Sequence, residues 1–319
     1  MNANVNASID VLVDQHQVVA KGVVHMVLKA RDGGELPAWS PGAHIDVFLP
    51  GSLVRQYSLC GDPQQRDRYE IAVLDELESR GGSRFLCREL AAAAELCIGF
   101  PRQLFPLQRS ANYFFIAGGI GITPLLPMLR EATACGANWQ LLYGGRSRDS
   151  MAFAEALVHA YGERVHVAPQ DASGLLDLDR WIGKPMPNTL VYACGPEALL
   201  QAVEARCAQW PAGSLHTERF APKPMNAIED DRPLEVVLKR SGQTLSVPPG
   251  TSILEAAEAA GVSCLSACGQ GTCGTCWTRV LEGVPDHRDS LLDDEQRDAG
   301  DQMLICVSRA KTPRLVIDL

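Results

Sequence analysis

Several features that mark other protein classes are missing from this sequence. Residues 1–4 lack the basic and apolar regions of a secretory signal peptide. The longest uncharged stretch, 110–129, is interrupted by three glycines and two prolines, so we expect a strand, a turn and a helix there rather than a membrane span. The net charge of −9 argues against nucleic-acid binding, which depends on clustered Lys and Arg. We therefore expect a cytoplasmic protein with neither a membrane nor a nucleic acid as partner.

A Rieske centre is excluded as well, because it needs histidine ligands and no C-x2-H occurs in the chain. What the chain does contain is C-x4-C-x2-C-x29-C, formed by Cys268, Cys273, Cys276 and Cys306. This spacing is typical of plant-type [2Fe–2S] clusters, and the glycines of the loop 268–276 allow the backbone to curl around the cluster. Zinc and unliganded core cysteines are the alternatives, although zinc sites more often use two C-x2-C pairs.

The eleven cysteines are an odd number, four of which are assigned to the cluster, so the pattern favours a reducing compartment over a disulfide framework. Cys264 precedes the loop by four residues, and we expect a small packed side chain there rather than a fifth ligand. Acidic residues crowd the segment between Cys276 and Cys306. They predict a negatively charged docking face and are Asp286, Asp289, Asp293, Asp294, Glu295, Asp298 and Asp301.

The sequence pattern predicts three domains. Residues 1–107 contain short alternating strands separated by Gly and Pro, as in an antiparallel β-barrel. Residues 108–221 alternate apolar strands with amphipathic helices, as in an α/β parallel sheet with helices on both faces. Residues 222–232 read as a linker. Residues 233–319 have the order hairpin, helix, cluster loop and late strand, as in a β-grasp ferredoxin domain.

The predicted α/β domain carries a nucleotide motif, Gly118-Gly119-Ile120-Gly121-Ile122-Thr123-Pro124, between a strand and a helix. We expect Thr123 to cap that helix and Pro124 to be its first residue, so that free N–H groups face a pyrophosphate. A plain tight turn is the alternative. A second strand end, Cys194-Gly195-Pro196, belongs to the same edge of the sheet, where ligands of open α/β sheets bind. Cys194 could lie against a nicotinamide or be purely structural.

Two motifs in the first domain suggest binding of a phosphate-bearing ligand. Arg55 and Tyr57 share one face of a predicted strand, with Ser58 beside them, and could meet one ligand or form a cross-strand surface pair. The segment Arg80-Gly81-Gly82-Ser83 resembles an anion-binding nest at the start of a helix, suited to a terminal phosphate.

Taken in order, R-x-Y-S-L, R-G-G-S, G-G-I-G-I-T-P, C-G-P, E-x-F, the cysteine pattern and C-V-S-R-A-K resemble the phthalate dioxygenase reductase family over essentially the whole chain. The resemblance implies a reductase component of a Rieske-type oxygenase, in which NADH, FMN and a [2Fe–2S] cluster carry electrons to the oxygenase.

The resemblance also implies roles for the motif residues. By this resemblance, the residues that contact FMN are Arg55, Tyr57, Ser58 and Thr123, and the residues that bind its phosphate are Arg80, Gly81, Gly82 and Ser83. The residues that form the NADH site are Gly119, Gly121, Cys194, Gly195 and Pro196. In E-x-F, Glu218 and Phe220 border the flavin, and the ring of Phe220 covers it until nicotinamide displaces it.

Some positions depart from the family pattern or leave alternatives open. Asp75 stands where relatives carry a basic residue, which lowers the positive charge near the flavin phosphate. Arg146 and Arg148 could accept the 2′-phosphate of NADPH or be solvated loop charges. A reductase that serves a different monooxygenase acceptor, or a non-catalytic module that binds zinc and a nucleotide, are the alternative functions.

Overall fold

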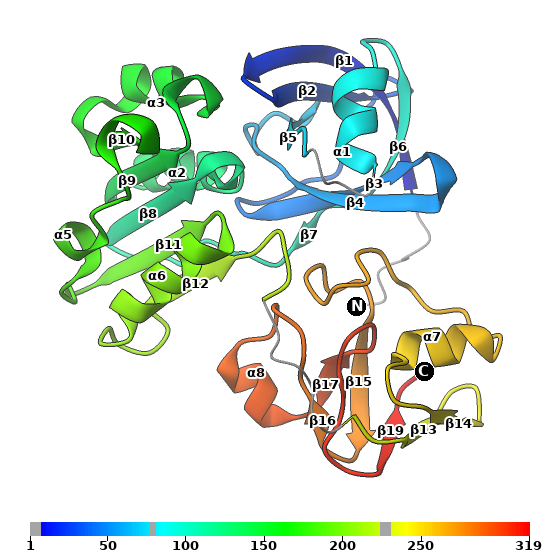
Figure 1. Ribbon diagram of the computed structural model, residues 1–319. Coiled ribbons are helices and arrows are strands. Elements are labelled where there is room, and N and C mark those ends of the chain that lie inside the picture. The colour runs from blue at the N-terminus through cyan, green and yellow to red at the C-terminus, as the bar shows by residue number, and fades with distance from the viewer. Residues whose placement is uncertain (1–7, 77–80, 224–230) are drawn as a thin grey trace. The chain divides into compact units, whose positions relative to one another are not determined.

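The computed structural model describes residues 8–76, 81–223 and 231–319, and the chain divides into two compact units, Met1–Glu218 and Arg219–Leu319 (Figure 1). Each unit is described by itself. Over the described ranges, none of the helices combines the length and apolar character that a transmembrane segment requires.

The first part of unit 1 is an antiparallel sheet in the order β4-β3-β6-β1-β2-β5, with β7 beside β3. The chain after β4 also bonds to β5, since the Cys60 N–H donates to the Glu70 carbonyl at 2.9 Å, which brings the two ends of the sheet together. The strands are β1 (Ser8–Ala20), β2 (Val23–Ala30), β3 (Ala43–Leu49), β4 (Leu53–Ser58), β5 (Tyr69–Leu74), β6 (Glu95–Gly99) and β7 (Arg102–Gln103). This sheet confirms the predicted antiparallel domain.

Period-two alternation explains why these segments form strands around a core. On β3, Ile45 and Val47 are fully buried, and they pair across the sheet with Tyr57 and Arg55 of β4. A helical segment interrupts the strands between β5 and β6. It consists of α1 (Gly82–Arg84) and a π-helical turn, Phe85–Glu89, and it covers one end of β4 and β5.

The second part of unit 1 is a parallel sheet in the order β10-β9-β8-β11-β12. Its strands are β8 (Asn112–Gly118), β9 (Asn138–Gly145), β10 (Val165–Pro169), β11 (Thr189–Cys194) and β12 (Leu215–Glu218). Its helices are α2 (Leu125–Ala134), α3 (Ala154–Tyr161), α4 (Gln170–Ser173), α5 (Leu178–Ile182) and α6 (Glu197–Cys207). Residues of α2 and α3 share one hydrophobic cluster, and residues of α5 and α6 share another, as predicted for a sheet covered on both faces.

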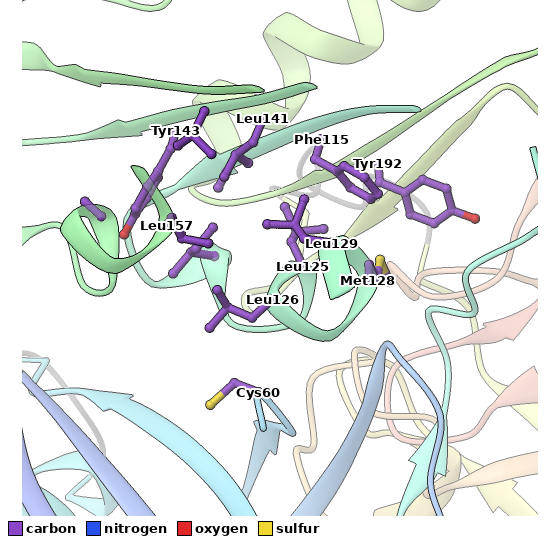
Figure 2. Close-up of a cluster of buried hydrophobic side chains, with 14 of the residues drawn as sticks. Cys60, Phe115, Leu125, Leu126, Met128, Leu129, Leu141, Tyr143, Leu157 and Tyr192 are labelled. Carbon is purple, nitrogen blue, oxygen red and sulfur yellow. The ribbon is translucent and has the colours of Figure 1, made fainter. Parts of the chain in front are cut away.

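Figure 2 shows the first of these clusters, in which Phe115 of β8 and Leu141 of β9 face Leu125 and Leu129 of α2. Cys60, which follows β4 of the antiparallel domain, belongs to the same cluster. The Arg130 guanidinium of α2 also donates to the Cys60 carbonyl at 3.2 Å. The two sheets of unit 1 are therefore joined by a shared apolar core and by a polar contact at its edge.

Unit 2 has a mixed sheet in the order β14-β13-β19-β15-β17, with a small ladder of β16 and β18. Its elements are β13 (Leu234–Leu238), β14 (Gln243–Val247), α7 (Ile253–Ala259), β15 (Trp277–Glu282), β16 (Pro285–Asp286), α8 (Asp294–Ala299), β17 (Gln302–Leu304), β18 (Arg309–Ala310) and β19 (Arg314–Ile317). The predicted hairpin is formed by β13 and β14 and turns at Gly242, where φ is +70°, and a capping box between Ser252 and Glu255 opens the predicted helix, α7. The predicted order of hairpin, helix, cluster loop and late strand is confirmed.

The predicted linker 222–232 lies largely outside the described residues, which stop at 223 and resume at 231. Both described ends of it bond to unit 2. The Lys223 N–H donates to Ser290 Oγ at 2.7 Å, and Asp231 accepts from the Gly250 N–H at 2.6 Å and from the Arg309 guanidinium at 2.8 Å. The boundary at 107/108 and the extent of the linker remain predictions.

Candidate functional site

The two glycine motifs of the parallel sheet meet backbone to backbone at its carboxyl edge. A Cβ added to Gly121 would lie 2.3 Å from the Cys194 carbonyl oxygen, and one added to Gly195 would lie 2.9 Å from the Gly118 Cα. A Cβ on Gly118 would lie 2.6 Å from Pro196 Cδ. Glycine is thus required by close approach of the chains at these three positions, and at Gly119 by its φ of +56°. The edge where the sequence predicted a nucleotide is built around glycine.

The predicted capping role of Thr123 is wrong. A 3-10 turn, Gly119–Ile122, runs directly into α2, and Thr123 has helical backbone angles, with φ −58° and ψ −51°. Its hydroxyl donates to the Ile120 carbonyl at 3.0 Å and its side chain is buried. Pro124 occupies the capping position instead. The residues just before Thr123 already form a 3-10 turn, so Thr123 itself is helical and does not take the extended conformation of an N-cap residue.

Glu218, Ser58 and Cys194 come together from three strands of unit 1. The Ser58 hydroxyl donates to the Glu218 carboxyl group, while Glu218 Oε2 is buried without a hydrogen-bond partner. Burial raises the pKa of Glu218 to about 8, and the Ser58 contact opposes that rise. Cys194 is fully buried, and burial together with the nearby Glu218 carboxyl raises its pKa well above the ordinary thiol value. This site joins the ends of β4, β11 and β12.

Arg55 and Tyr57 lie on one face of β4, as predicted from their alternation. A Cβ on Gly82 would lie 2.7 Å from Arg55 Cγ, so the arginine stem packs against the glycine motif at the start of α1. Burial raises the pKa of Tyr57, which keeps its phenol neutral. The two motifs of the antiparallel domain are therefore neighbours in space.

The predicted anion-binding nest is described from Gly81 onward, and Arg80 lies outside the described residues. Gly81 has a φ of +100°, which favours glycine, and it caps α1. Ser83 is buried, with its Oγ accepting from the Glu76 N–H at 3.4 Å. Asp75 bonds to the Arg88 guanidinium at 2.7 Å, so the carboxylate that departs from the family pattern is compensated by a nearby cation.

The four cluster cysteines are 5–8% exposed and converge in unit 2. The thiols of Cys268 and Cys273 contact each other, those of Cys276 and Cys306 contact each other, and Cys268 also contacts Cys306. The Gln270 N–H points at the Cys268 sulfur at 3.2 Å. Thiol pairs with an N–H group turned toward sulfur are the donor set that a [2Fe–2S] cluster needs.

Cys264 is half-buried and its sulfur lies 3.5 Å from the Val262 carbonyl, consistent with a packed side chain rather than a fifth ligand.

One residue of the predicted acidic face is not on the surface. Asp289 is 4% exposed, and its Oδ1 accepts from the N–H groups of Leu291 and Leu292 at 2.9 and 2.7 Å. A Cβ on Gly271 of the cluster loop would lie 2.9 Å from the Asp289 Cα. Asp289 therefore supports the loop, and its prediction as a docking residue is wrong.

Arg146, Arg148 and Phe220 are exposed. Arg146 and Arg148 follow β9 and are exposed, so the alternative coenzyme NADPH stays open. Phe220 is 47% exposed and belongs to unit 2, whereas Glu218 ends unit 1. Its role beside a flavin remains a prediction.

Sequence reasoning missed a polar network on β3. Asp46 accepts from Gln56 Nε2 at 2.6 Å and from the Arg102 guanidinium at 2.8 Å. His44 lies 3.2 Å from Arg102, and burial together with that arginine lowers the His44 pKa to about 3. His44 pairs across the sheet with Ser58, so the network lies on the same face as the Ser58 hydroxyl. Polar residues at alternate positions of an otherwise apolar strand were the signal.

Comparison with known proteins identifies both nucleotide and cluster domains. Residues 115–205 match the oxidoreductase NAD-binding domain family, and residues 236–311 match the 2Fe-2S iron-sulfur cluster binding domain family. The first match contains the glycine edge, and the second contains all four cluster cysteines. The site and the fold thus define an NAD-binding iron–sulfur oxidoreductase.

Similar proteins extend the comparison to the whole chain. Tetrachlorobenzoquinone reductase of Sphingobium chlorophenolicum is 40% identical, with 98% of each chain covered. The phthalate 4,5-dioxygenase oxygenase reductase subunit of Pseudomonas putida is 40% identical, with 94% of each covered. The crystal structure of phthalate dioxygenase reductase, described as a modular structure for electron transfer from pyridine nucleotides to [2Fe–2S], matches with TM-score 0.73 and 35% identity over 98% of each chain.

A longer protein contains the same fold. An intact type IV self-sufficient cytochrome P450 monooxygenase matches with TM-score 0.92 and 41% identity over 98% of this chain, which spans only 41% of that longer chain.

The chain belongs to the phthalate dioxygenase reductase family. It is an electron-transfer reductase of the kind that serves oxygenase systems, passing electrons from a pyridine nucleotide to a [2Fe–2S] centre. The predicted family, fold and enzyme class are confirmed.

Proposed function

We propose that this reductase takes electrons from NADH, carries them through FMN to its [2Fe–2S] cluster, and delivers them to a terminal oxygenase in a transient complex in the cytoplasm. The observation that carries the proposal is the meeting of Ser58, Cys194 and Glu218 beside the glycine edge in unit 1. A flavin held by the antiparallel domain and a nicotinamide held by the parallel sheet would both border these three side chains.

The chemistry of the carriers explains why one chain needs three sites. FMN, when bound, accepts a hydride's two electrons and releases them singly, and the cluster takes one electron at a time. The protein's own residues would position the carriers and shield them from water. Arg55 supplies a fixed positive charge toward the flavin side, together with Gly81, Gly82 and Ser83 at the start of α1, and Arg80 is assigned to the same phosphate.

At the coenzyme side, Gly119, Gly121, Gly195 and Pro196 shape the edge that would receive NADH, while Thr123 and Tyr57 would border the flavin. The Glu218 carboxyl is protonated at neutral pH because its pKa is about 8, so it can donate a hydrogen bond without adding negative charge next to an incoming hydride. Cys194 stays a neutral thiol for the same reason of burial. Phe220 is assigned the covering role that the family resemblance implies.

Localisation in the cytoplasm is supported by the thiols. None of the eleven cysteines, all of which lie in the described part of the chain, forms a disulfide. A reducing compartment keeps four of them available to iron.

An anaerobic titration with NADH, followed by visible absorption and low-temperature EPR, tests the proposal. Bleaching of a flavin band and of broad iron–sulfur absorption, with a reduced-cluster EPR signal, is the expected result. Chromatography of the released flavin should give FMN, and NADPH should be the poorer donor. A colourless protein that contains zinc would favour the non-catalytic module instead.

A second assay separates possible acceptors. Reconstitution with a Rieske oxygenase component should give NADH-dependent substrate oxidation. Turnover only with an unrelated monooxygenase would support the alternative acceptor while leaving the internal carriers unchanged.

A further inference from the structure

An exposed tryptophan directly follows a cluster ligand in unit 2. Trp277 is 51% exposed, whereas the preceding Cys276 is only 5% exposed. The Trp277 N–H bonds back to the Gly274 carbonyl of the cluster loop at 3.1 Å, and its indole Nε1 donates to Gln302 Oε1 of β17. The indole is thus held at a fixed place on the surface, one peptide bond from a sulfur ligand.

The exposure of Trp277 continues along one face of β15. Arg279 and Leu281 are also exposed, and they alternate with Thr278 and Val280, which are each 6% exposed. Tryptophan and arginine are the residue types that dominate the binding energy of protein interfaces. A rigid indole with a flanking guanidinium and an exposed leucine is therefore the composition of a contact surface.

Carboxylates border this face. Asp293, Glu295, Asp298 and Asp301 are exposed on and around α8, which packs beside β17 (Figure 1). The Val280 N–H donates to the Asp301 carbonyl at 2.8 Å, so the acidic segment is directly attached to β15.

The one cation of that segment does not offset the exposed carboxylates. The Arg297 guanidinium turns inward and donates to the carbonyls of Leu292 and Asp289 at 2.9 and 2.7 Å, and it lies 3.5 Å from Asp289 Oδ1. It therefore compensates the buried Asp289 and leaves the outer carboxylates as net negative charge. A partner that matches them carries basic side chains around an apolar patch.

We propose that Trp277 with the carboxylates of 293–301 is the surface on which the electron acceptor docks, and that the acceptor is a protein with a basic rim. This inference rests on the proposed function. The step on this surface is a single electron transfer: the reduced iron–sulfur centre loses one electron, the acceptor metal gains it, and no bond or proton is exchanged. NADH replaces the electrons.

Cytochrome c, a basic haem protein, is the probe, and ferricyanide is the small anionic control. Trp277→Ala should lower the second-order rate of cytochrome c reduction at least about fivefold, because the central anchor is lost. Ferricyanide reduction and the rate at which NADH bleaches the cluster should be unchanged. Val284→Ala, which truncates another exposed apolar residue of unit 2, 49% exposed, is the matched control and should leave all three rates at the wild-type value.

Charge reversal tests the acidic border. Asp298→Lys should slow cytochrome c reduction about threefold or more at low salt and flatten its dependence on ionic strength. Glu258→Lys makes the same charge change at an exposed position of α7 and should have a smaller effect.

The outcomes distinguish the possible occupants of the surface. If Trp277→Ala slows bleaching of the cluster by NADH as much as cytochrome c reduction, the surface serves the chain's own flavin unit, and the proposal is overturned. Unchanged cytochrome c reduction in both Trp277→Ala and Asp298→Lys would also overturn it. If NADH fails to bleach the wild-type cluster at all, the proposed function itself fails, which is a separate result.

Discussion

The Ser58 hydroxyl donates to the Glu218 carboxyl group, and this contact joins the end of β4 in the antiparallel sheet to the end of β12 in the parallel sheet. Neither strand neighbours the other in sequence or in a sheet. The coenzyme edge and the flavin-side motif of unit 1 are therefore connected through the Glu218 carboxyl group, and the proton that this carboxyl group itself binds makes a testable contribution to stability.

Glu218→Gln should flatten the dependence of stability on pH. The folded-state pKa of about 8 exceeds the ordinary value of 4.5, so the folded protein binds the proton more tightly than the unfolded chain. The stabilisation is complete below pH 4.5 and is lost as pH rises to about 8, by at most about 1.4 kcal/mol per pH unit. Thermal unfolding between pH 5 and 8 measures it. A glutamine variant whose Tm falls with pH as steeply as the wild type would contradict this prediction.

Gly121→Ala should damage the coenzyme edge, because its Cβ would lie 2.3 Å from the Cys194 carbonyl oxygen. We expect the KM for NADH to rise at least about tenfold and the Tm to fall, since backbone has to move to relieve the overlap. Gly136→Ala is the control. Gly136 follows α2 with a φ of +70° and has open space around it, so alanine there should cost about 1–2 kcal/mol in stability and leave KM unchanged. Equal KM values in the two variants would contradict the assignment.

Cys273→Ala should abolish cluster assembly, while Cys264→Ser should retain it. Cys273 contacts Cys268 within the ligand set, whereas Cys264 bonds only to the Val262 carbonyl among the contacts described. Iron and acid-labile sulfide analysis of the purified variants, together with visible absorption, measures the difference. Loss of iron in Cys264→Ser at unchanged yield of folded protein would show that the ligand set is wrong.

Arg55→Ala should weaken FMN binding about tenfold or more, because the variant loses the proposed charge-assisted contact to the flavin and the side-chain stem that packs on Gly82. Recovery of free-flavin fluorescence on dilution measures the dissociation constant. Arg31→Ala removes an exposed arginine in the turn directly after β2, which pairs with Glu95 at 3.0 Å, and this variant should bind FMN as the wild type does. Parallel weakening in both variants would point to a general loss of charge instead.

The architecture was predictable because the apolar residues recur with clear periods and because Gly and Pro mark the turns between the elements. The amphipathic helices predicted between the strands of 108–221 are present, with α2 and α3 among them, and the helix predicted after the hairpin of 233–319 is α7. Short elements with weak patterns, such as β10 and β12, were missed because a few residues carry no readable period.

The contacts among the predicted site residues could not be predicted from the sequence. The strand pattern pointed to Ser58 and the family resemblance pointed to Glu218, yet nothing local in the sequence indicates that the two residues bond to each other. Asp289 illustrates the opposite error: sequence shows its charge but not its burial, which depends on the N–H groups of Leu291 and Leu292. Thr123 was misassigned because the helical sense of a glycine turn depends on backbone angles that composition leaves open.

Because Lys223 and Asp231 both bond to unit 2, their contacts determine where a linker between the two units could be lengthened. The described residues on either side of 224–230, Lys223 and Asp231, both bond within unit 2, so residues inserted between them would leave the connection from unit 1 to unit 2 unchanged. The covalent crossing between the units lies at Glu218–Arg219, next to the carboxyl group bonded to Ser58. A spacer that uncouples the two halves of this enzyme has to be placed there, at the risk of disturbing the coenzyme edge.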